Sequence, residues 1–159
     1  MTHLKISGLA SLCLALVVAA EALSSPAVSE EQARQAIEAR KQVFKDMESA
    51  FKPVGAMLKK PREPFDAAVV QTSAERIEEL SGKIPELFQL DTSKFAIETE
   101  ARAGIWNSLT DFNAKADAMA KAAADMKAAA QSGDQGAMRK AAIQVGRTCG
   151  SCHDSFRDK

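Results

Sequence analysis

Residues 138–156 have the sequence MRKAAIQVGRTCGSCHDSF, the clearest structural signal in the chain. Apolar or sulfur-bearing residues recur in it at alternating steps of four and three, at Met138, Ala142, Val145, Cys149, Cys152 and Phe156. Steps of this length align side chains along one face of an α-helix. The spacing therefore predicts a helix that packs in a bundle and carries both cysteines on its buried face.

The first of three earlier stretches with this spacing begins at Ser29. Ser29 and Gln32 can form a capping box at the start of a helix. The same alternation then runs through Ala33, Ile37, Arg40, Phe44, Met47 and Phe51. Because proline lacks a backbone N–H, we expect Pro53 and Gly55 to end or kink this helix.

The second and third helices are bounded by cap and breaker residues. Asp66 is a plausible N-cap for the second helix, and Gly82 is the expected stop. After a long connection, from about residue 88 to 98, we expect a third helix from near Thr99 to Gly133. Asp134 is the expected cap of the last helix.

Composition agrees with helices and argues against some partners. The chain has 159 residues, which suits one domain, and its formal net charge is zero. The chain has no excess of basic residues that would indicate nucleic acid or an anionic membrane as a partner. No segment alternates with a period of two, so we expect no sheet. Four helices and one long link predict an all-α, antiparallel four-helix bundle.

Residues 1–22 predict a secretory signal peptide that is cleaved. His3 and Lys5 make a weakly basic start, residues 6–20 lack charge, and residues 20–22 offer a small-x-small cleavage site. A membrane anchor is the alternative, but fifteen helical residues span about 22 Å, short of a roughly 30 Å bilayer core. We therefore expect a mature domain of residues 23–159 in the periplasm, with no membrane attachment after cleavage.

Residues 149–153 form Cys-Gly-Ser-Cys-His, the attachment pattern of c-type haem. Cys149 and Cys152 are three residues apart, so they project from nearly the same side of a helix. Both thiols can then reach the two vinyl groups on one porphyrin edge. His153 follows directly and can bind the iron from one side. The sequence predicts one covalent haem c, with His153 as axial iron ligand near the C-terminus of the last helix.

Three other uses of the two cysteines are weaker. A redox C-x-x-C follows a strand in a βαβ unit, and no strand is expected here. A zinc site needs four ligands, but the mature chain offers one histidine besides the cysteines. A disulfide between Cys149 and Cys152 would close almost no loop and stabilise little.

The chain resembles the cytochrome c′ family, the class II c-type cytochromes, over about residues 30–159. The resemblance rests on the C-terminal run from Cys149 to Arg157, on Ile105-Trp106 opening the third helix, and on residues 36–44 of the first helix. The family's fold is a four-helix bundle with haem near the C-terminus, as expected above.

Arg40 lies in an apolar stripe, where an unpaired guanidinium would be costly. It can reach solvent or pair with an acidic side chain of the bundle. The resemblance instead implies a bond to a haem propionate, which suits the arginine fork. Lys41 is a further propionate candidate, although the family often has an amide there.

The resemblance makes Phe44 the residue on the distal side of the iron. In low-spin relatives the corresponding residue is a methionine that binds iron, and phenylalanine cannot do so. Phe44 is alternatively a packing residue. The resemblance makes Met47 a wall of the distal pocket, and Met47 as a sixth ligand is the alternative. Arg157 is expected on the proximal side, or else as a solvated arginine at a helix end.

The resemblance thus implies a monohaem cytochrome with a five-coordinate, high-spin iron that binds NO and CO and can transfer single electrons. The alternative is a low-spin, six-coordinate electron carrier with a methionine ligand. We expect no enzyme, because the sequence offers no second redox centre and no distal acid–base pair. The resemblance also implies a homodimer formed through the first two helices, and electron transfer implies an unidentified redox partner protein.

Overall fold

Three of the four long helices begin at side chains that satisfy free backbone N–H groups. In the computed structural model, which describes residues 28–158, the four helices are α1 (Glu30–Leu58), α2 (Ala67–Leu87), α3 (Leu109–Ser132) and α4 (Gln135–Phe156). Ser29 and Gln32 form the predicted capping box of α1. The carboxylates of Asp66 and Asp134 cap α2 and α4. The all-α prediction is confirmed, and so are these three helix starts.

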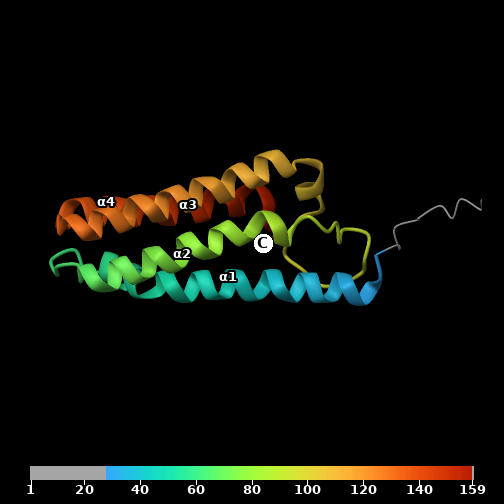
Figure 1. Cartoon of the computed structure of the whole chain (residues 1–159), viewed down its shortest axis with the longest axis horizontal. Helices are drawn as coiled ribbons and strands as arrows, with labels where there is room; N and C mark the ends of the chain where they lie inside the picture. The colour runs from blue at the N-terminus through green and yellow to red at the C-terminus, as the bar shows by residue number, and fades with distance from the viewer. Residues whose placement is uncertain (1–27, 159) are drawn as a thin grey trace, which may run out of the picture.

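The helices form an up-and-down bundle in which neighbours along the chain are neighbours in space (Figure 1). Short links join α1 to α2 and α3 to α4 at one end of the bundle. The long connection between α2 and α3 lies at the other end, together with the start of α1 and the C-terminus of α4. The C-x-x-C-H stretch therefore shares its end of the bundle with the connection.

Side chains from all four helices meet in the core. Its fully buried members include Ile37 and Val54 from α1, Ile77 from α2, Met126 from α3 and Met138 from α4. At the end of α3, Gly133 takes a positive φ of 70°, which glycine adopts without steric cost. The predicted stop at Gly133 is confirmed.

The predicted helix stop at Gly82 is wrong, and Pro53 and Gly55, which were expected to end or kink the first helix, do not end it. The α1 helix continues past Pro53 to Leu58, because Val54 is fully buried and the last turn still packs on the core. The α2 helix continues past Gly82 to Leu87, because Ile84 is buried at 5% exposure. In both helices, tertiary burial outweighs the local preference of a breaker residue.

The third helix starts later than predicted. A short 3-10 helix, η1 (Ala103–Asn107), follows Thr99, and α3 begins only at Leu109. The residues after Thr99 are held elsewhere, because Ala101 forms an isolated antiparallel bridge with Arg157. That bridge is the only β-type pairing in the described part of the chain, which contains no strand.

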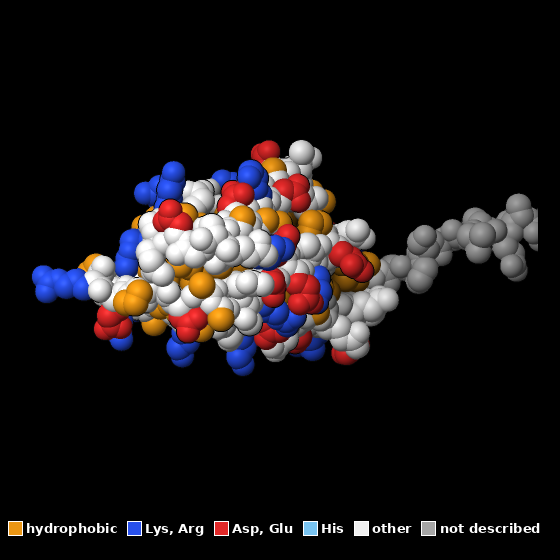
Figure 2. Space-filling model, turned by 60° about the vertical axis from the view of Figure 1, so that its left-hand side comes forward, with side chains coloured by type: hydrophobic (Ala, Val, Ile, Leu, Met, Phe, Trp, Pro, Cys, Tyr) orange, Lys and Arg blue, Asp and Glu red, His pale blue; other side chains and the backbone are white. Residues whose placement is uncertain are grey.

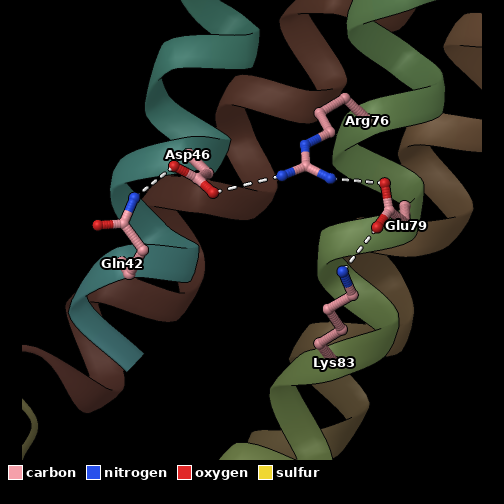
Figure 3. Close-up of polar contacts among 5 residues, drawn as sticks. All are labelled: Gln42, Asp46, Arg76, Glu79 and Lys83. Carbon is pink, nitrogen blue, oxygen red and sulfur yellow. Dashed lines mark hydrogen bonds and ion pairs between the residues drawn. The ribbon is translucent and has the colours of Figure 1, made fainter. Parts of the chain in front are cut away.

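The polar surface carries mixed charge. Figure 2 shows basic and acidic side chains interspersed on one face of the bundle. The Arg76 guanidinium on α2 lies between Asp46 of α1, at 3.3 Å, and Glu79, at 2.7 Å (Figure 3). Glu79 also accepts from Lys83 at 2.6 Å. Exposed pairs of this kind contribute about 0–1 kcal/mol each, so the core carries most of the stability.

Within residues 28–158 we find no helix with the length and hydropathy that crossing a membrane requires. The predicted signal peptide, residues 1–22, lies outside the described residues.

The core predicts a contrast between two residues of α4. Met138 is fully buried, whereas Ile143 is 41% exposed. We expect Met138→Ala to lower the free energy of unfolding by about 2–5 kcal/mol, because it leaves a cavity. Ile143→Ala should change it by less than about 0.5 kcal/mol. Urea unfolding of the mature protein measures both, and equal losses would contradict this assignment of the core.

Candidate functional site

The α4 helix places the two thiols at the edge of the core. Val145, one turn before Cys149, is 1% exposed and belongs to the core. Cys149 and Cys152 are half-buried free thiols that pack against this core. The predicted common face is therefore confirmed, and the thiols lie where the buried stripe of α4 meets its more exposed end.

Burial raises the pKa of both thiols. The pKa of Cys149 rises through desolvation, and that of Cys152 rises because desolvation outweighs the nearby charge of Lys115. Redox-active C-x-x-C motifs depend on a thiol with a lowered pKa, because the thiolate is the nucleophile. The site therefore does not fit a thiol–disulfide redox motif. Zinc fits no better, since no group of three metal-binding side chains occurs in residues 28–158.

His153 lies on the exposed side of the last turn of α4. Partial desolvation lowers its pKa, and so does the positive charge of Arg157, while Asp154 and Glu100 oppose the shift. A lowered pKa favours the neutral imidazole at physiological pH. Neutral imidazole is the form that binds a metal, so its surroundings suit His153 as an axial ligand.

The register between α1 and α4 identifies the residues of α1 at the height of the motif. A Cβ atom built on Gly146 of α4 would lie 4.0 Å from the Phe51 ring of α1. The two helices are antiparallel, so moving back along α1 corresponds to moving forward along α4 by the same rise per residue. Met47 is therefore level with about residue 150, and Phe44 with about His153.

Phe44 and Met47 differ in burial. Phe44 is 38% exposed, one of two large apolar side chains exposed in the described chain. Its ring meets Phe88 edge-on, with 6.2 Å between centroids. Met47 is 9% exposed and belongs to the core. Phe44 is thus not a buried packing residue, whereas the Met47 thioether is already part of the core.

An aromatic cluster lies at this end of the bundle. The Phe88 ring, 2% exposed, is 4.5 Å from Phe112 and 6.2 Å from Trp106. Phe112 in turn meets Phe156 of α4 edge-on at 5.3 Å. Phe88 was predicted only as the start of the long connection after the second helix. Its position directly after the apolar residues Ile84 and Leu87 was the signal for its burial.

Arg40 is a buried guanidinium, 3% exposed, that holds the connection after α2. Its Nε donates to the backbone oxygen of Leu87 at 2.8 Å, Nη2 to that of Leu90 at 2.6 Å, and Nη1 to Thr92 Oγ1 at 2.7 Å. The guanidinium also lies 4.5 Å from the Phe88 ring centroid. Arg40 thus neither reaches solvent nor forms an ion pair. Three of its five N–H groups are used, so the propionate contact stays a prediction.

Lys41 and Arg157 are exposed and paired with acidic side chains. Lys41 Nζ lies 2.9 Å from Glu38 on its own helix. Arg157 directly follows α4, its backbone N–H donates to the His153 oxygen at 3.1 Å, and its side chain meets Glu100 at 2.6 Å. The Glu100 partner was missed by sequence reasoning, because 57 residues separate the two side chains.

An antiparallel four-helix bundle with Cys-x-x-Cys-His at the end of its last helix defines a c-type haem protein. The comparison with known families agrees with this class. A sequence model of the family described as Cytochrome C′ matches residues 35–157. The chain therefore belongs to the cytochrome c′ family.

Individual relatives are similar over most of their length. Cytochrome c′ of Rhodopseudomonas palustris is 43% identical over 121 residues, which are 76% of this chain and 80% of that protein. The structure of cytochrome c prime from Shewanella frigidimarina matches 82% of this chain and 100% of its own, at 37% identity and a TM-score of 0.72. A nitric oxide complex of a leucine-to-isoleucine variant from Alcaligenes xylosoxidans matches 80% and 97%, at 29% identity and a TM-score of 0.69.

Family membership makes the chain a monohaem c-type cytochrome whose cofactor is one covalently bound haem c with its iron. The residues present fit this group. Two free thiols lie three residues apart on one side of α4, an imidazole with a lowered pKa follows, and aromatic rings line the same end of the bundle.

The Arg40 contacts predict a large loss of stability on substitution. Arg40→Met keeps an apolar stem but leaves the part-buried oxygens of Leu87 and Leu90 and the buried Thr92 hydroxyl without this donor. We expect the free energy of unfolding to fall by about 2–4 kcal/mol. Arg34→Met, which removes an exposed pair with Glu30 on the same helix, should change it by less than about 0.5 kcal/mol. Comparable losses in urea unfolding would contradict the assigned role of Arg40.

Proposed function

We propose that this chain is a periplasmic cytochrome c′ that binds NO and CO at a five-coordinate, high-spin haem. In this proposal Cys149 and Cys152 form the thioether bonds, and His153 is the axial iron ligand. The observation that supports it is the register between α1 and α4, from which we infer that Phe44, an exposed hydrocarbon ring, is about level with His153.

The bound haem iron supplies an open axial position for a diatomic ligand and takes up or releases one electron. His153, whose pKa is lowered by partial burial and by Arg157, would provide one axial ligand. Phe44 has no atom that coordinates iron, and beside a bound haem its ring would limit the access of water to the side opposite His153. The side chain is half-exposed and has one ring partner, Phe88, so it can move when a small ligand enters.

The ligand class follows from the residues around Phe44. His153 is the only histidine of residues 28–158, so no distal histidine is available to donate a hydrogen bond. Bound O₂ depends on such a donor, whereas NO and CO do not. The nitric oxide complex of the Alcaligenes xylosoxidans relative supports NO as a ligand. We therefore favour ligand binding over enzymatic turnover.

Export and electron transfer complete the proposal. The signal-like residues 1–22 direct the chain to the periplasm, where the haem is attached and the mature domain begins near residue 23. The single haem can exchange one electron with a redox partner protein. On the propionate side, Arg40 has two free N–H groups, and Lys41 lies beside it at the exposed surface.

We also propose a homodimer through α1 and α2. A shallow groove at α1 and the end of α2 is lined by the apolar residues Ala36, Val43, Leu87 and Leu90 and by the charged residues Lys83 and Glu86. A second copy would bury this surface. Light scattering of the mature protein should give twice the monomer mass, and Val43→Asp should return it to one. A monomer at all concentrations would contradict the dimer without affecting the haem site.

An iron with His153 as its only protein ligand should give a high-spin spectrum, and one substitution should change this spectrum to low-spin. We expect the mature protein to show a high-spin ferrous Soret band and to form NO and CO adducts. Phe44→Met places a thioether at the height of His153, so this variant should turn low-spin, with a sulfur–iron charge-transfer band and weakened CO binding. Absorption spectroscopy with CO titration measures both effects.

Met47→Leu is the matched control, because it removes the other thioether on this side of α1 at nearly constant volume. It should leave the high-spin spectrum unchanged. A low-spin spectrum in the unmodified protein that becomes high-spin in Met47→Leu would contradict the proposal and establish Met47 as the sixth ligand.

A further inference from the structure

The segment before η1 is bonded to the end of α4 and the residues that follow it. We call residues 100–102 and residues 156–158 together the clasp. The Arg102 N–H donates to the Phe156 oxygen at 3.0 Å, and the Asp158 N–H donates to the Glu100 oxygen at 2.8 Å. These two bonds flank the bridge between Ala101 and Arg157. The backbone on both sides of Arg157 is therefore fixed to the segment that carries Glu100.

Side chains reinforce the clasp. The Arg102 guanidinium donates to the backbone oxygens of Asp154 and Ser155, at 3.1 and 3.2 Å, and pairs with Asp158 at 3.0 Å. These carbonyls are among the last of α4, which lack partners within the helix. The final turn of α4, which carries His153, is thus closed by residues from outside the helix.

Glu100 and Arg157 form the ion pair of the clasp. Both Nε and Nη2 of Arg157 lie 2.6 Å from Glu100 Oε2. The two side chains are 67% and 49% exposed, so the ion pair alone would be weak in water. Because the backbone bonds already hold the two residues together, the pair forms with little further loss of conformational freedom.

The pair lies one helical turn past His153, because the Arg157 backbone N–H donates to the His153 carbonyl oxygen at 3.1 Å. The charges of Arg157 and Glu100 also act in opposite directions on the pKa of His153. Lys115 of α3 approaches the same turn and donates to Ser151. From α1, the charge of Lys41 lowers the pKa of Glu100, and the charge of Glu48 raises the pKa of Arg157. Among these groups, Arg157 and Glu100 are the two of opposite sign that bind each other directly.

We propose that Glu100 is a positioning residue for Arg157: the Glu100 carboxylate holds the Arg157 side chain against the clasp, and the two charges cancel. This pairing lowers the reduction potential of the haem iron. The inference rests on the proposed ligation by His153. Reduction adds one electron to the iron site, so a positive charge nearby favours the ferrous form. With Glu100 in place the guanidinium is compensated and fixed. Without Glu100 it is uncompensated and free to approach the haem.

The test is a mediated redox titration of the mature protein and its variants. Glu100→Gln should raise the ratio of ferrous to ferric protein at a fixed potential about threefold, which at 59 mV per tenfold is an upward shift of about 28 mV. Arg157→Gln should shift the potential downward. Glu100→Asp keeps the charge but shortens the reach, so it should give a smaller upward shift.

The double variant separates positioning from a simple charge effect. In the Arg157→Gln background, Glu100→Gln should shift the reduction potential by less than half of the shift that it causes in the unmodified protein. The control is Glu63→Gln, which breaks a similarly exposed pair with Lys60 at the opposite end of the bundle and should leave the potential unchanged. Equal shifts in both backgrounds, or a Glu100→Gln shift no larger than that of the control, would overturn the proposal. The potential is measured without NO, so failure here leaves the proposed ligand binding intact.

Discussion

The packing of α4 on the core is the constraint on which the site depends. Met138, Ala142 and Val145 are at most 1% exposed, and together they fix the rotation of α4 about its axis. Cys149 and Cys152 continue the same stripe by one and two further turns. Their thiols therefore point to the edge of the core, against which both side chains pack. A rotation that moved them would expose three buried side chains, each costing about 1–3 kcal/mol.

Two arginines hold the long connection at the end of the bundle. Arg40 of α1 binds the connection after α2 through two backbone oxygens and Thr92. Arg102, just before η1, binds the last turn of α4. Each guanidinium supplies donors to carbonyls that no helix satisfies, so the long connection is held at both of its ends. The aromatic cluster around Phe88 lies between these two fixed points.

Much of the fold and part of the site could be predicted from sequence, because helical spacing and caps are local signals. The stripe from Met138 to Phe156, the capping residues Ser29, Asp66 and Asp134, and the stop at Gly133 are confirmed. The stop at Gly82 is wrong and Pro53 does not end its helix, because the burial of Val54 and Ile84 depends on other helices. The partners of Arg40 and Arg157 were beyond sequence reasoning for the same reason: the residues that meet them are about fifty positions away.

Peptide mass spectrometry of the protein secreted with its own signal tests the central claim most directly. If the face of α4 holds haem through both thiols, the peptide that contains residues 149–157 should carry the mass of one haem. The haem should also resist extraction by acid–acetone. A peptide with free thiols or a disulfide between Cys149 and Cys152 would contradict the account, whatever the fold of the bundle.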